Sequence, residues 1–195
     1  ARYMENAVFS LPNPLITEKV VTAVSALPLH DRDLKGDLYE YMISKLQTAG
    51  RVGQFRTPRH IIRMMVRLMR PQPRDRIVDP ACGTGGFLVG AGSFVREHYD
   101  RELRTDRSVQ EHFENEMFTG YDTDQTMLRI TAMNTILHGM DGADIQFSDA
   151  LSKNNTDTDK YTLVLANPPF KGSLDGQNVA GSLTAKGAPE VEVNS

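Results

Sequence analysis

The chain has 195 residues, of which 39% are hydrophobic and 24% charged, so it can bury the core of one domain with attachments. Its single cysteine, Cys82, excludes an internal disulfide and metal sites built from several cysteines, while no secretory signal or membrane-length apolar run is visible, so we expect a cytoplasmic protein. The formal net charge is −3, so the chain lacks the overall positive charge of proteins that bind nucleic acid without a partner.

Three helices are predicted in the first part of the chain. Apolar residues at helical spacing indicate helices over residues 14–27 and 31–50. A third helix is predicted to begin at Thr57 and Pro58, with Thr57 as its N-cap and Pro58 at its first helical position, and to end before Pro71. Its methionines are interpreted as core residues, because flexible thioethers fill irregular gaps.

From residue 76 onward, strands alternate with helices. This alternation predicts a parallel sheet with helices on both faces and a ligand at the carboxyl ends of the strands. The charged end of the first of these helices is interpreted as a solvated face. The expected strands are 76–81, 117–122, 143–150 and 161–167, and the expected helices are 86–104 and 124–138.

The chain is expected to divide into three parts. Residues 1–56 form a helical lead-in, residues 57–178 a partial Rossmann-like core, and residues 179–195 an irregular tail. Because a sheet that ends at its fourth strand lacks a covering partner, we expect that further C-terminal strands are missing.

The first motif is DPACGTGGF, residues 79–87, between the first strand and its helix. Its three glycines permit a tight turn and close approach of a ligand to free N–H groups of the helix N-terminus. The G-T-G-G spacing differs from the dinucleotide fingerprint G-x-G-x-x-G. Asp79 offers a carboxylate to a cationic group of the ligand. Cys82 has no neighbouring histidine in the sequence, so we interpret it as a small residue that fills the loop.

Two further aspartates follow the next strands. Asp122 ends the second strand, where such folds place the acid that binds ribose hydroxyls. Asp149 follows the third strand, where its carboxylate would accept a hydrogen bond from the amino group of an adenine ring. Either residue alone is typical of an ordinary turn, and only their joint placement at successive strand ends indicates a nucleoside site.

The most specific motif is Asn167-Pro-Pro-Phe170, at the end of the fourth strand. Its two prolines lack N–H groups and leave carbonyl acceptors. Methyl transfer to an exocyclic amine needs such acceptors, because the Asn167 side-chain oxygen and the Pro168 carbonyl can bind both amino hydrogens and free the nitrogen lone pair for attack. Phe170 would stack on a base that has been swung out of the duplex.

Four segments together resemble the modification subunits of type I restriction–modification enzymes, a family that methylates adenine N6 in DNA. These segments are residues 36–62, 79–89, 120–134 and 167–175, and the resemblance covers roughly residues 13–178. It implies a Rossmann-like methyltransferase fold, S-adenosylmethionine as the cofactor and a flipped adenine as the substrate.

The resemblance also implies which residues form the site. The segment GQFRTP precedes the glycine loop and in the family contributes to the methionine end of the cofactor. No metal is expected. The implied cofactor residues are Gln54, Phe55, Thr57, Pro58, Asp79, Ala81, Gly83, Thr84, Gly85, Gly86, Phe87, Asp122, Asp149, Ala150 and Asn167, and the implied catalytic residues are Asn167, Pro168, Pro169 and Phe170.

Partners follow from the same resemblance. It implies DNA, a specificity subunit that reads the sequence, a restriction subunit and a second modification subunit, and no membrane. Family members also have an N-terminal helical domain and further strands after the catalytic motif, which are absent from this sequence.

Two alternatives stay open. One is methylation of a glutamine side chain or an RNA base, by families that share the glycine loop and an Asn-Pro-Pro motif. The other is a truncated cofactor-binding or assembly module without activity. A nicotinamide oxidoreductase is disfavoured by the loop spacing.

Overall fold

The computed structural model describes residues 13–27, 32–48, 57–150, 152, 155, 157, 159–168, 174–175 and 193–194. Among these residues, no helix has the length and apolar character needed to cross a membrane. The elements are α1 (Pro14–Ser25), α2 (Arg32–Thr48), α3 (Arg59–Met69), β1 (Ile77–Asp79), α4 (Gly86–Thr105), α5 (Arg107–Asn115), β2 (Phe118–Asp122), α6 (Gln125–Leu137), β3 (Asp144–Phe147), β4 (Leu163–Val164), β5 (Leu174–Asp175) and β6 (Val193–Asn194).

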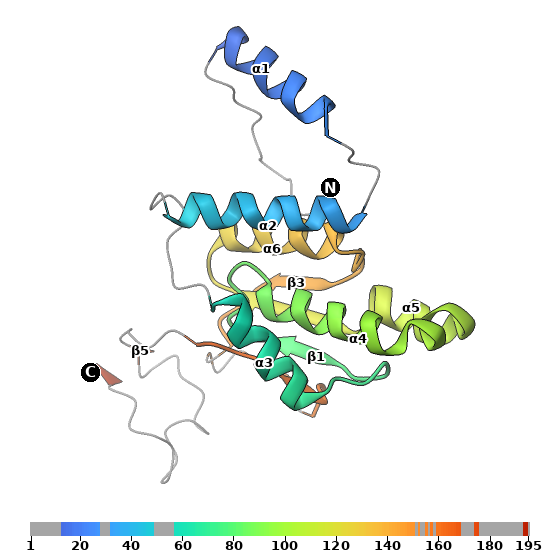
Figure 1. Cartoon of the computed structure of the whole chain (residues 1–195). Coiled ribbons are helices and arrows are strands. Elements are labelled where there is room, and N and C mark those ends of the chain that lie inside the picture. The colour runs from blue at the N-terminus through green and yellow to red at the C-terminus, as the bar shows by residue number, and fades with distance from the viewer. Residues whose placement is uncertain are drawn as a thin grey trace.

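Four parallel strands form the central sheet, in the order β3-β2-β1-β4 (Figure 1). From β1 the chain steps to β2 and then to β3 in one direction, whereas β4 pairs with the other edge of β1. The strand order therefore reverses between β1 and β4. Open α/β sheets bind ligands at such a reversal, outside the carboxyl ends of the strands. The predicted parallel α/β sheet is confirmed. A separate, short parallel pair joins β5 to β6.

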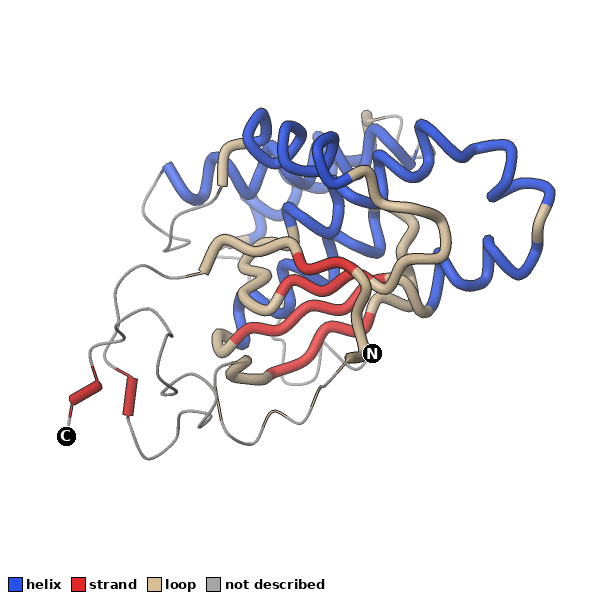
Figure 2. The backbone as a smooth tube through the Cα atoms, turned by 90° about the horizontal axis from the view of Figure 1, so that it is seen from below, coloured by secondary structure: helices blue, strands red, loops and turns tan. Residues whose placement is uncertain are grey.

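The crossover helices pack on one face of this sheet (Figure 2). Helix α4 contacts β1 and β2, and α6 contacts β2 and β3. Both connections step in the same direction, so right-handed crossovers place both helices on the same side. Side chains from this face and from α4 form the core, in which Ile77, Leu88, Phe118 and Ile145 are fully buried.

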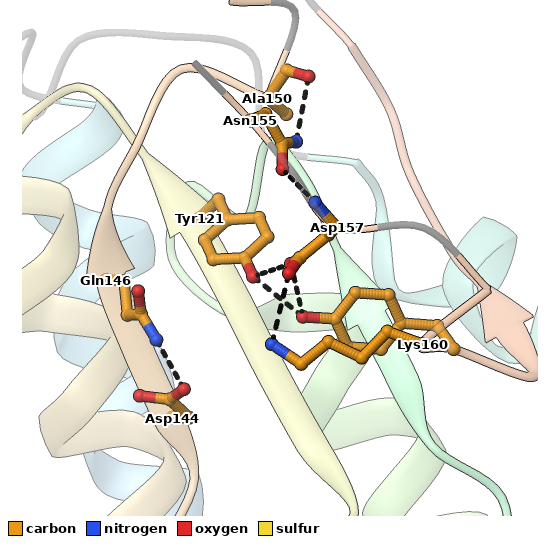
Figure 3. A network of polar contacts seen from close by, with 8 residues as sticks. Tyr121, Asp144, Gln146, Ala150, Asn155, Asp157 and Lys160 are labelled. Carbon is orange, nitrogen blue, oxygen red and sulfur yellow. Dashed lines mark hydrogen bonds and ion pairs between the residues drawn. The ribbon is translucent and has the colours of Figure 1, made fainter.

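The opposite face is polar around β2, and in the described residues no helix covers it. Tyr121 points to this face, and its hydroxyl donates a hydrogen bond to Asp157 and lies 2.7 Å from the hydroxyl of Tyr161 (Figure 3). Lys160 completes the group with an ion pair to Asp157 at 3.3 Å. In the described residues, the helices that contact the sheet, α4 and α6, thus lie on one face of it, and helices on the other face stay a prediction.

Helices α2 and α3 rest on the crossover helices rather than on the sheet. Helix α3 packs on α4, and α2 packs on α6 (Figure 1). Ile62 of α3 is buried against Gly86 and Gly90 of α4, where an added Cβ would lie 2.9 and 2.7 Å from its side chain. Small residues on α4 therefore let α3 approach closely and fix its position next to the glycine loop.

Helix α3 differs from its prediction in two ways. It begins at Arg59, with Pro58 as its N-cap and without a side-chain cap, so the prediction of Thr57 as N-cap is wrong. Pro58 has an extended ψ of 139°, and its carbonyl accepts hydrogen bonds from the first turn instead. Met64 and Met69 are 51% and 54% exposed, so the interpretation of the α3 methionines as core residues is wrong for these two.

Helix α5 was not expected from the sequence. Its N-cap is Asp106, whose carboxylate accepts hydrogen bonds from the backbone N–H groups of Ser108 and Val109. Val109 and Phe113, one turn apart, are its buried residues. Because charged residues surround these two apolar positions, the amphipathic pattern of α5 is difficult to recognise in the sequence.

Candidate active site

The predicted site residues that the structure describes gather along one edge of the sheet, at the carboxyl ends of adjacent strands. Asp79 ends β1 and Asp122 ends β2. The backbone of Ser148 donates a hydrogen bond of 3.1 Å to the Asp122 carbonyl, which places Asp149 next to the end of β2. On the other side, β4 pairs with β1 and leads directly to Asn167. The site thus spans all four strands.

The glycine loop has the backbone conformation that its sequence predicts. Gly83 and Gly85 have φ angles of +52° and +77°, a region that side chains rarely adopt. A Cβ added at Gly83 would meet no atom within 4 Å, so this glycine faces open space. A Cβ at Gly85 would lie 2.9 Å from the methyl group of Thr131 on α6. One glycine therefore leaves room for a ligand, and the other lets the loop pack on α6.

Two side chains of α6 form hydrogen bonds to backbone carbonyls of the glycine loop. Thr131 donates a hydrogen bond of 2.5 Å to the Gly83 carbonyl, and Asn134 donates one of 2.9 Å to the Thr84 carbonyl. Both side chains are fully buried. Among the described residues, the Asn134 side-chain oxygen is buried and has no hydrogen-bond partner. Sequence reasoning missed this support, although both residues lie in the segment 120–134 that carries the family resemblance.

Asp122 also holds the loop. One carboxylate oxygen accepts a hydrogen bond of 2.9 Å from the backbone N–H of Gly83, and the other accepts one of 2.9 Å from Asp124. The Asp122 side chain is half-buried. Each oxygen keeps a further lone pair for a ligand hydroxyl. The residue predicted for ribose binding therefore shapes the glycine loop as well.

Asp79 is 1% exposed. The pKa of this carboxyl group is raised to about 7, chiefly by burial and to a smaller extent by the negative charge of Asp122, against the hydrogen bond from the Ala81 backbone N–H, which lowers it. Near neutral pH this carboxyl group gains or loses its proton easily. A cation placed beside it would favour the ionised form.

Cys82 is buried and its pKa is raised, first by desolvation and then by the charge of Asp79. Its thiol lies 3.8 Å from the Thr131 hydroxyl. A thiol with a raised pKa is a poor nucleophile, which supports its interpretation as a residue that fills the loop.

Asn167 contacts the segment that precedes α3. Its side-chain NH2 donates a hydrogen bond of 2.9 Å to the hydroxyl of Thr57, 110 positions away in the sequence. The Asn167 side chain is half-buried, and Pro168 is exposed. The most specific predicted motif and the GQFRTP segment therefore meet at one point, which neither motif indicates on its own.

The remaining predicted residues divide into three groups. Gln54, Phe55, Pro169 and Phe170 lie outside the described residues. Thr84 and Phe87 are buried, and Ala81 is half-buried in the glycine loop. The Ala150 carbonyl accepts a hydrogen bond of 3.1 Å from Asn155, within the loop that follows β3. In the described part of the chain, no three acidic, histidine or cysteine side chains are grouped as a metal site would require.

Helix α3 carries a basic surface that the net charge of the chain conceals. Residues 57–74 contain five arginines and no acidic residue. Arg59, Arg63 and Arg67 line a cavity of about 550 Å³ next to α3 and α4, which is also lined by Asp37, Glu40 and Glu97. Arg59 also forms an ion pair with the buried Glu40 of α2. The sequence of α3 is thus locally basic, although the chain as a whole has a net charge of −3.

Comparisons with known proteins give a consistent result. The family described as N-6 DNA Methylase matches residues 30–189. The EcoEI type I methylase subunit of Escherichia coli is 34% identical over 145 residues, which cover 73% of this chain and 29% of that protein. The EcoKI type I methylase subunit of E. coli K12 is 33% identical over 155 residues, with 76% and 29% covered.

A solved structure shows the same fold. The modification subunit of a putative type I restriction enzyme from Vibrio vulnificus YJ016 superposes with a TM-score of 0.61 at 32% identity, over 72% of this chain and 29% of that chain. This chain therefore spans less than a third of the length of each of these relatives.

Proposed function

Because this chain belongs to the N-6 DNA methylase family, we propose that it forms the catalytic part of a DNA adenine-N6 methyltransferase. By its similarity to the EcoEI and EcoKI subunits, the whole protein is the modification subunit of a type I restriction–modification enzyme. We propose residues 57–178 as the methyltransferase core, with a lead-in over residues 1–56 and a tail over residues 179–195.

One observation supports this function most directly. The pairing of β4 with β1 puts Asn167 at the same sheet edge as the glycine loop, at the point where the strand order reverses. A methyl donor bound at the loop and an amine bound at Asn167 would lie next to each other there. Transfer between two bound groups needs this proximity, and much of the catalytic rate comes from it.

The described residues fit S-adenosylmethionine as the cofactor. Gly83 faces open space and gives a ligand access to the backbone of the loop. Asp122 is at the strand end that suits ribose hydroxyls, and the buried Asp79 suits the cationic amino group of the methionine moiety. When bound, this cofactor supplies an electrophilic methyl group. The roles of Asp149 and Ala150 at the adenine ring belong to the same proposal, as do those of Gln54, Phe55, Thr57 and Pro58 at the methionine end.

In this proposal, Asn167 and Pro168 act on the amine of the substrate. Their two oxygens accept its hydrogens, which draws the nitrogen lone pair away from the ring and towards the methyl group. As the N–C bond forms, the bond between the sulfonium sulfur and the methyl group would break and leave a neutral thioether, and one hydrogen would leave the nitrogen as a proton to solvent. Pro169 would stiffen the loop, and Phe170 would stack on the flipped base.

The partners are proposed from the relatives and from charge. The proposed partners are a specificity subunit, a restriction subunit and a second modification subunit. Together they would supply sequence recognition and most of the affinity for DNA. The chain alone, with its net charge of −3, should bind DNA weakly and without sequence preference, through arginines such as those of α3. The cytoplasmic location stays a prediction.

The test is a methylation assay with labelled cofactor on duplex DNA, structured RNA and protein extract. It uses the complete modification subunit, assembled with its specificity subunit. Label in DNA that digestion identifies as N6-methyladenine supports the proposal. Label in RNA or in glutamine would overturn the proposal and favour methylation of RNA or of a protein glutamine. Cofactor binding without any turnover favours the assembly module.

A further inference from the structure

We infer that Thr57 is a positioning residue for Asn167, which holds the amide of that side chain in the orientation that methyl transfer requires. This inference rests on the proposed function and adds to it, because the family resemblance implies only a cofactor role for Thr57. The observation behind it is the 2.9 Å hydrogen bond from the Asn167 NH2 group to the Thr57 hydroxyl oxygen.

The chemistry of an amide makes its orientation important. The Asn167 side chain has an acceptor oxygen on one side and a donor NH2 group on the other. An adenine amino group carries only donor hydrogens at this point, so it needs the oxygen. A rotation of the amide by 180° would place two NH2 groups against each other. The Thr57 hydroxyl, which can donate as well as accept, accepts from the NH2 group in the structure, and the amide oxygen lies on the other side.

Thr57 is well held for this purpose. It lies directly before α3, whose first turn is closed by hydrogen bonds of 2.9 and 3.1 Å from the Ile61 and Ile62 N–H groups to the Pro58 carbonyl. Ile62 is buried against α4. The helix start is fixed on its other side by Arg59, whose guanidinium donates to the buried Glu40 of α2. Thr57 therefore has a fixed position relative to the glycine loop.

Asn167 has fewer constraints of its own. The backbone before it is fixed to β1 by the hydrogen bond of 3.0 Å from the Leu165 N–H to the Val78 carbonyl. Among the described residues, the Thr57 hydroxyl is the partner that the structure gives to its side chain. A base bound over Asn167 would exclude water from this NH2 group, and an unpaired buried donor is costly. The loss of the Thr57 acceptor should therefore act on the step in which the base is bound.

The experiment compares Thr57→Val and Thr57→Ser in the complete, assembled enzyme. Single-turnover methylation of duplex DNA is measured at saturating cofactor, together with the Kd for S-adenosylmethionine. Valine has the shape of threonine without the acceptor, so we expect methylation to slow about 10- to 100-fold. The serine variant should keep most of the rate, and because the cofactor is saturating, a change in its Kd in either variant does not enter this rate. Thr105→Val, which removes an exposed hydroxyl on α4, is the matched control.

Two results would overturn the inference. One is a wild-type methylation rate for Thr57→Val. The other is a loss of cofactor affinity in Thr57→Val whose effect on rate disappears at saturating cofactor, since this would make Thr57 a cofactor ligand only. If the wild-type enzyme fails to methylate DNA, the proposed function fails instead. The contact is then tested in the chain by NMR, where Thr57→Val should shift the Asn167 side-chain NH2 signals and Thr57→Ser should not.

Discussion

The two ends of the candidate site are built differently. The glycine loop after β1 is held by Asp122 at the end of β2 and by Thr131 and Asn134 of α6, all within 60 positions in the sequence. In the described residues, the side chain of Asn167 after β4 is held by Thr57, which precedes the first strand. The glycine loop is thus held by residues that are close to it in the sequence, whereas the Asn167 side chain is held by a residue 110 positions away.

This difference indicates how the two ends should respond to change. Substitutions in the loop should alter both stability and cofactor binding, because the same hydrogen bonds shape the backbone and the ligand surface. Substitutions at Asn167 should alter the reaction and leave stability and cofactor affinity nearly unchanged. Four measurements test this contrast.

The largest effect is expected for Asn167→Ala in the complete, assembled enzyme. The lost acceptor matters most as the amine nitrogen becomes tetrahedral, so kcat should fall with little change in cofactor affinity. By analogy with the loss of one oxyanion-hole donor, the cost is about 2.7–4 kcal/mol. Single-turnover methylation measures it, with the exposed Asn115→Ala as control. A wild-type rate in Asn167→Ala would show that this motif is not catalytic.

The glycine loop offers a matched pair for the second measurement. Alanine at either Gly83 or Gly85 is strained at positive φ, at about 1–2 kcal/mol. At Gly85 the new methyl would also press on Thr131 at 2.9 Å, which adds at least about 1 kcal/mol of overpacking. Urea unfolding should therefore rank Gly85→Ala below Gly83→Ala in stability.

The same pair separates stability from binding. A methyl group at Gly83 would point into open space where we place the cofactor, so Gly83→Ala should lose more cofactor affinity than its stability loss suggests. Equal stability for the two variants would contradict the packing of the loop on α6. Unchanged affinity in Gly83→Ala would place the cofactor elsewhere.

The position of Asp122 was predictable from the sequence, but its contact with the glycine loop was not. The sequence places it at a strand end, and the parallel sheet confirms that position beside the glycine loop. Its hydrogen bond to the Gly83 backbone depends on how two loops meet, which no periodicity encodes. The contact of Thr57 with Asn167 was unpredictable for the same reason, and the N-cap prediction even assigned the Thr57 hydroxyl to another partner.

The fold, too, could be predicted only as far as the sequence pattern encodes it. Alternating apolar and polar segments predicted the strands and the main helices, because burial on one face leaves a period in the sequence. Helix α5 was missed because its buried face consists of Val109 and Phe113 within a charged run. The exposed Met64 and Met69 were misassigned because a helical period shows which residues share a face and not whether another element covers it.

Asp122→Ala is expected to have the third-largest effect. It removes the proposed charged acceptor for a ribose hydroxyl and the observed acceptor of the Gly83 N–H, so cofactor affinity should fall by about 1.5–3 kcal/mol. Calorimetry of cofactor binding measures this loss, and urea unfolding in parallel measures the loss of the anchor. The exposed Asp141→Ala is the control. Unchanged affinity would remove Asp122 from the binding site.

The smallest effect is a pH dependence at Asp79. Burial raises the pKa of this carboxyl to about 7, so in the free protein it is mostly protonated below that pH. A cationic amino group beside it favours the carboxylate, so binding must release a proton there. Affinity should therefore rise about tenfold per pH unit between about pH 5.5 and 6.5, where an amino group stays charged.

Asp79→Asn tests this linkage directly, since its side-chain oxygen can still accept the Ala81 N–H. The variant should bind the cofactor with an affinity that is flat over the same pH range. Calorimetry in two buffers of different ionisation enthalpy gives the number of protons released, which should be near one for wild type below about pH 6 and near zero for the variant. An equal pH slope in both proteins would mean that another group titrates. A flat wild-type profile would mean that the amino group binds away from Asp79, and the loop end of the site would then serve the cofactor through Gly83 and Asp122 alone.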